Sequence, residues 1–70
     1  MATETQPTPT IIRRKTVEAR TGLSRSTLYL RVAKGTFPAP VNLGARAVGW
    51  LADEVTAWID ARVADSRKAT

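Results

Sequence analysis

The chain has 70 residues, enough for one small domain, because chains of this length bury only about 60% of the surface that they expose when unfolded. It contains neither cysteine nor histidine, which excludes disulfides, thiolate and imidazole metal sites and the usual nucleophile and base pairs, so we predict no catalytic residue, metal site or cofactor. The net charge is +5, and eight of the eleven basic residues lie between Thr10 and Trp50, which favours a polyanionic partner for that segment.

Polar segments stand at both ends of the sequence. Residues 1–10 hold four threonines and two prolines and no large apolar side chain after the initial methionine, so nothing offsets the entropy of ordering them. We therefore expect a flexible tail over residues 1–10, a domain over residues 11–64 and a frayed tail over residues 65–70. Ile11 and Ile12 are β-branched and favour a short strand at the start of the domain.

Two short helices are predicted next, with a tight corner between them. The first is expected to begin with Thr16 as its N-cap, to make less than two turns and to end at Gly22, which supplies the left-handed C-terminal cap. Ser24 is expected to cap the second helix, which runs to Lys34 and ends at Gly35. Helices joined by so few residues predict a helix-turn-helix arrangement.

The second helix has a core face and an exposed stripe. With 100° of rotation per residue, Leu28 and Val32 share one side, which we expect to face the core. The outward stripe carries Arg25, Ser26, Tyr29, Leu30 and Ala33. Tyr29 lies at the shoulder between the two faces, where its ring can pack while its hydroxyl stays accessible.

A hairpin and a third helix complete the predicted domain. Residues 41–43 and 48–50 alternate apolar and non-apolar, and the turn at residues 44–47 places Arg46 at the tip. Asp53 is expected to cap the third helix. Large apolar side chains recur along that helix at helical spacing, namely Val55, Trp58, Ile59 and Val63. Since both tryptophans, at positions 50 and 58, occupy apolar positions of their elements, we predict that they belong to the core.

Four blocks of the sequence resemble the AlpA family of phage-type regulators. The blocks are T-G-L-S-R-S-T-L-Y at residues 21–29, G-x-F-P-x-P-V-x-L-G at 35–44, R-A-V-x-W at 46–50 and E-V-x-A-W at 54–58. The resemblance implies a mainly α-helical fold with a small β-hairpin, a winged helix-turn-helix similar to the MerR DNA-binding head. It also implies a function on double-stranded DNA, either as a prophage or mobile-element transcriptional regulator or as an excisionase that directs an integrase.

The resemblance further implies which residues meet DNA. The recognition-helix motif is matched by Ser24, Arg25, Ser26, Thr27 and Tyr29, and the wing motif by Gly44 and Arg46. Leu30 and Arg31 depart from the family pattern, which usually has a basic residue at the first position and an apolar one at the second. Either the helix is rotated slightly, or the exposed Leu30 meets a thymine methyl group or a second copy of the protein.

The chemistry of the basic side chains is compatible with duplex binding. Arg25 can donate two hydrogen bonds to guanine in the major groove, or it remains solvated. Arg46 suits a wing at the minor groove or backbone, or it is an ordinary turn residue. Tyr29 either packs at the edge of the core or binds a phosphate. Thr27 either contacts a phosphate or is an ordinary polar residue of the first helical turn. Further phosphate contacts are predicted for the basic run Arg13, Arg14 and Lys15, and for Lys34.

One such module holds few phosphates, so we expect several copies to self-associate on DNA, with an integrase or RNA polymerase as further partners to consider. An alternative hypothesis, from a different functional class, is a protein-binding module such as an anti-repressor. In this case the positive face of the protein docks on an acidic partner. No apolar run approaches the roughly 18 residues of a membrane span, so no membrane partner is expected. The predicted location is the cytoplasm, in association with the nucleoid.

Overall fold

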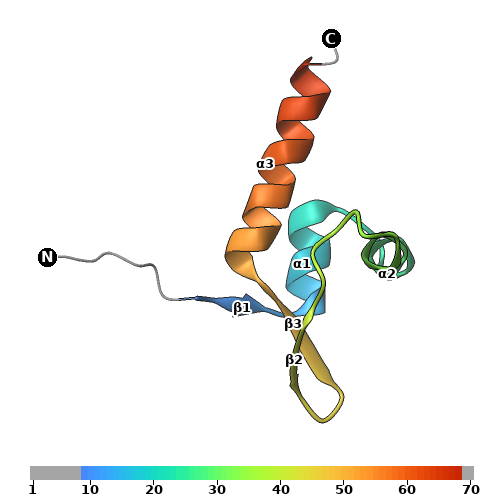
Figure 1. Ribbon diagram of the computed structural model, residues 1–70, viewed down its shortest axis with the longest axis vertical. Coiled ribbons are helices and arrows are strands. Elements are labelled where there is room, and N and C mark those ends of the chain that lie inside the picture. The colour runs from blue at the N-terminus through green and yellow to red at the C-terminus, as the bar shows by residue number, and fades with distance from the viewer. Residues whose placement is uncertain (1–8, 69–70) are drawn as a thin grey trace, which may run out of the picture.

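The computed structural model describes residues 9–68, so the remainder of the predicted tails, residues 1–8 and 69–70, lies outside the described residues. The elements in chain order are β1 (Ile11–Ile12), α1 (Arg14–Thr21), α2 (Arg25–Lys34), β2 (Val41–Gly44), β3 (Ala47–Leu51) and α3 (Ala52–Lys68) (Figure 1). Three helices combine with a small antiparallel sheet, which confirms the predicted winged helix-turn-helix class. The wing, defined here as residues 41–51, and α3 extend to opposite ends of the molecule (Figure 1).

The sheet has the strand order β1-β3-β2, with both pairs antiparallel. The predicted hairpin therefore exists, and the short strand β1 adds to its other edge, where Ile11 pairs with Leu51. The carbonyl of Thr10 accepts a hydrogen bond from the Ala52 N–H at 2.8 Å, so the predicted tail over residues 1–10 is tied down at its last residue. A Cβ on Gly49 would lie 2.4 Å from Ile11 Cγ2, so close packing of these strands requires glycine there.

Helix α1 begins earlier than predicted. Arg13 is its N-cap residue, without a side-chain cap, and the Arg13 carbonyl accepts the first helical hydrogen bond from the Val17 N–H at 3.0 Å. The prediction of Thr16 as N-cap is therefore wrong, because β1 ends at Ile12 and the chain turns directly into the helix. The helix has 8 residues, slightly more than two turns. Its predicted end is confirmed, with Gly22 at φ 76°.

Both predicted ends of helix α2 are confirmed. The Ser24 hydroxyl accepts a hydrogen bond from the Thr27 N–H at 3.2 Å, and Gly35 closes the helix at φ 76°. Leu28 is buried and Val32 packs against the core, as the helical spacing predicted. The predicted outward stripe is exposed along its whole length, from Arg25 to Ala33.

The core is small and takes one residue from each helix, one from β3 and one from the loop between α2 and β2. It consists of Val17, Leu28, Phe37, Trp50 and Val55. Trp50 is fully buried and donates its indole N–H to the Pro38 carbonyl at 2.8 Å, which confirms its predicted core position. Trp58 is half-buried at the core's edge, with its ring 4.9 Å from that of Phe37 and its N–H bonded to the Thr36 carbonyl.

Helix α3 differs from the prediction at both ends. It begins at Ala52, directly after β3, so Asp53 is a first-turn residue and its prediction as N-cap is wrong. The acidic side chain still lies near the positive end of the helix dipole, where it is favourable. The helix continues past Ala64 to Lys68, so residues 65–68 are helical where the sequence predicted a frayed tail. None of the helices described over residues 9–68 is both long and apolar enough to cross a membrane.

Candidate nucleic-acid interface

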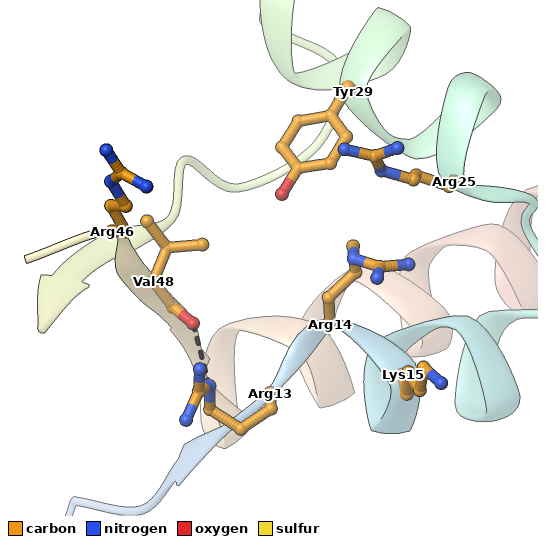
Figure 2. Close-up of a pocket in the computed structure, with 7 residues that line it drawn as sticks. All are labelled: Arg13, Arg14, Lys15, Arg25, Tyr29, Arg46 and Val48. Carbon is orange, nitrogen blue, oxygen red and sulfur yellow. Dashed lines mark hydrogen bonds between the residues drawn. The ribbon is translucent and has the colours of Figure 1, made fainter.

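A hollow of 470 Å³ opens between the start of α1, the first turns of α2 and the wing (Figure 2). It is lined by Arg13, Arg14, Lys15, Arg25, Tyr29, Arg46 and Val48. Five of these seven residues are cationic, and none of the described lining residues is acidic. Positive charge from three separate segments of the chain is therefore concentrated around one space.

The α1 side of the hollow is joined directly to the wing. Arg13 precedes α1 and donates its Nε–H to the Val48 carbonyl at 3.0 Å, a contact between residues 35 positions apart (Figure 2). Arg14, the next residue, forms an ion pair with Glu18 one turn further along α1. Since both side chains are partly exposed, this pair contributes only about 0.3–0.5 kcal/mol to stability and leaves the site with a net positive charge.

On the α2 side of the hollow, side chains pack against one another in a series that starts in the core. The rings of buried Trp50 and Tyr29 lie 6.1 Å apart with a tilt of 57°. The Arg25 guanidinium lies 6.0 Å from the Tyr29 ring centroid, within the range of a cation–π contact. The Tyr29 hydroxyl points into the space between α1 and the wing (Figure 2). Tyr29 therefore has the predicted shoulder position, and its ring holds Arg25 at the hollow.

The wing contributes Arg46 from the predicted tip. The turn between β2 and β3 requires left-handed backbone, which Gly44 adopts at φ 124° and Arg46 at φ 59°. Few residues other than glycine, asparagine and aspartate occupy this region readily, so an arginine here is unusual. The Asn42 side-chain oxygen accepts a hydrogen bond from the Gly44 N–H at 2.9 Å, which further fixes the turn.

The other residues predicted to meet DNA lie outside the lining of the hollow. They are Ser24, Ser26, Thr27, Lys34 and Gly44. The Ser24 hydroxyl donates to Thr27 Oγ1 at 3.1 Å, so these two side chains serve the helix cap. Ser26 and Lys34 are exposed on α2, with Lys34 at the end furthest from the hollow. Sequence reasoning did not single out Val48, whose backbone carbonyl anchors Arg13 and which no local pattern identifies.

The structure explains the departure from the family pattern at residues 30 and 31. Leu30 is 54% exposed, whereas Arg31 turns inward, with its guanidinium 5.9 Å from the Trp58 ring. Arg62 lies 5.8 Å from the same ring, so two cations pack against one indole between α2 and α3. Arg31 is therefore part of the packing between these helices.

The fold and the basic hollow define a small winged-helix protein with one strongly cationic face. Residues 10–63 match the family described as prophage CP4-57 regulatory protein (AlpA), and the chain belongs to this family of regulatory proteins. A relative is the uncharacterized protein ORF88 of Enterobacteria phage P4, 51% identical over 47 residues. That match covers 67% of this chain and 53% of the relative, so the chain spans about half of the relative's length.

Proposed function

We propose that this protein binds double-stranded DNA at specific sequences and thereby regulates transcription in a prophage or other mobile element. The observation that carries the proposal is the convergence of five cationic side chains beside the exposed stripe of α2. Neutralised phosphates dominate the affinity of proteins for DNA, so such a face favours a duplex. On this proposal the protein acts by occupying DNA, without catalysing a reaction, and works on the nucleoid in the cytoplasm.

In the proposed complex, α2 enters the major groove. The groove is about 12 Å wide and accepts one helix, whose first residues meet the base edges. Arg25 and Ser26 occupy that end of α2, and Arg46 extends from the wing toward the minor groove or the flanking backbone. We propose further contacts to the DNA backbone for Arg14, Lys15, Ser24, Thr27, Tyr29, Lys34 and Gly44.

The test is binding of the full chain to duplex DNA at a site selected from a random library. About four to six neutralised phosphates give a slope near −4 to −5 in a plot of log affinity against log salt concentration. Fluorescence anisotropy at several salt concentrations measures this slope. Absence of binding to any duplex at modest ionic strength would contradict the proposal and would favour a protein-binding module that docks on an acidic partner.

Mapping of bound sites across the genome separates regulation from recombination. Occupancy of promoters supports the regulator, whereas occupancy confined to a phage attachment site contradicts it and favours an excisionase that acts with an integrase. Since one module buries only about 600–1,000 Å² on DNA, we propose that several copies bind together at such sites. Footprint lengths in the same experiment measure the number of copies.

A further inference from the structure

We propose that the basic hollow is a preformed seat for one phosphate group, and that a free phosphoanion occupies it when no DNA is bound. The inference rests on the proposed function for its natural ligand, a phosphodiester of the DNA backbone. It goes further in assigning that phosphate to a particular place and in requiring the seat to exist before DNA arrives. The groups assigned as phosphate ligands are the side chains of Arg13, Arg14 and Arg46 and the Tyr29 hydroxyl. Arg25 lies beside them, on the side of the hollow that faces the DNA bases in the proposed complex.

Three of the side chains around the hollow are held by contacts within the protein. Arg13 is tied to the Val48 carbonyl, Arg14 to Glu18, and Tyr29 packs on buried Trp50. The conformational entropy of these long side chains is thus partly lost on folding rather than on binding. An ordinary solvated basic surface lacks such anchors, so the anchoring indicates a prepared binding site.

The hydrogen-bond donors around the hollow that are not used in the described contacts are well suited to binding a phosphate. The described contacts of Arg13 involve only its Nε, so its two terminal nitrogens remain to donate to phosphate oxygens. Guanidinium groups bind phosphate through paired, charge-assisted hydrogen bonds, and a tyrosine hydroxyl adds a neutral donor. The volume of 470 Å³ lies within the range of about 300–1,000 Å³ typical of small-molecule pockets, so a phosphate enters together with its attached sugars.

The positive charge around the hollow also affects the stability of the folded protein. Five cations around one space repel each other when it is empty, and this repulsion opposes the folded state. A bound anion removes that repulsion and bridges α1, α2 and the wing. We therefore expect phosphate to raise the melting temperature more than chloride does at the same ionic strength.

The experiment is a titration of the ¹⁵N-labelled full chain with inorganic phosphate, with sodium chloride adjusted to keep the ionic strength constant. We expect saturable changes in the amide spectrum at residues 13–15, 25–29 and 46–48, together with a rise in melting temperature. Changes spread evenly over the molecule, or equal to those produced by chloride, would overturn the inference.

Arg46→Asn is the sharpest variant, because asparagine tolerates the left-handed backbone of the tip while the charge is lost. We expect its affinity for phosphate to fall about tenfold, the value of one charge-assisted hydrogen bond. Lys68→Gln is the matched control, since it removes the same charge at the end of α3, outside the hollow, and its phosphate affinity should stay within about twofold. Equal losses of phosphate affinity in the two variants would show that binding depends only on the net charge of the protein, and would overturn the inference.

A labelled duplex separates this inference from the proposed function. If both are correct, inorganic phosphate competes with the duplex more strongly than chloride at equal ionic strength, and Arg46→Asn abolishes the difference. Duplex binding without any phosphate effect overturns the seat and leaves the proposed function standing. Phosphate binding without duplex binding supports the seat for a small phosphoanion and overturns the proposed function.

Discussion

Arg25 and Tyr29 lie one turn apart on α2, and their contact links the buried core to the basic hollow. Tyr29 is 37% exposed, and its ring lies 6.1 Å from that of buried Trp50, so the side chain packs toward the core while part of it remains accessible. A guanidinium held over such a ring keeps its hydrogen-bond donors free, because the cation–π contact uses the planar face of the group. The pair therefore leaves the donors of Arg25 available for the base recognition that we propose for it.

Arg25→Ala is expected to abolish the preference for the selected site while leaving the melting temperature nearly unchanged. A bidentate contact to guanine contributes about 1–3 kcal/mol of discrimination, whereas an exposed cation–π contact contributes about 0.5–1 kcal/mol to stability. A gel-shift competition between the selected site and random duplex measures the preference. Unchanged discrimination in this variant would remove Arg25 from base recognition.

Leu30 is the most exposed of the large apolar residues in the described part of the chain, and it lies in the middle of the α2 stripe. If it contacts a thymine methyl group, replacing that thymine by uracil in the selected site should weaken binding about fourfold, the value of one buried methyl or methylene group. In Leu30→Ala the same replacement should have no effect. If the unmodified protein and Leu30→Ala were equally sensitive to uracil, the contact with the thymine methyl group would be contradicted. If Leu30→Ala weakened binding only at high protein concentration, Leu30 would instead contact a second copy of the protein.

At the scale of elements, local signals and long-range contacts determine different features. The ends of α2 and the end of α1 could be predicted because Ser24, Gly22 and Gly35 are local caps whose conformations need no tertiary partner. The start of α1 could not, since it follows directly on β1, whose pairing with β3 joins residues far apart in the sequence. For the same reason the addition of β1 to the wing sheet was not predictable from its two isoleucines.

Gly49→Ala is expected to lower the free energy of unfolding by about 1–3 kcal/mol, through overpacking between β1 and β3. The added Cβ would lie 2.4 Å from Ile11 Cγ2 and 3.0 Å from the Ile12 carbonyl oxygen. Urea unfolding followed by tryptophan fluorescence measures the change. Combining it with Ile11→Ala should recover part of the loss, because the nearest clashing atom is then absent. A double variant as unstable as the sum of the single variants would contradict this explanation.

At the scale of the whole molecule, the candidate site is a product of the fold. The basic residues of α1, α2 and the wing tip could each be identified from the sequence, and the family resemblance implied that they contact DNA. Their convergence on one hollow could not be predicted, because it depends on how α1 meets β3 and how the left-handed turn aims Arg46. A small core has to hold this arrangement together, and Trp58 closes its outer edge between Phe37 and two arginines.

Trp58→Ala is expected to remove a large fraction of the stability of the domain and to lower its melting temperature strongly. Removing a buried aromatic side chain costs about 3–5 kcal/mol, and the lower end applies here because Trp58 is only half-buried. A 70-residue chain has a total stability of only about 4–10 kcal/mol. Thermal melting followed by circular dichroism tests this, with Trp58→Phe as the milder variant. It keeps an aromatic ring beside Phe37 but loses the hydrogen bond to the Thr36 carbonyl, worth about 1 kcal/mol, and part of the ring against which the two arginines pack. A cooperative melt in Trp58→Ala at the unaltered temperature would contradict this contribution of Trp58 to stability.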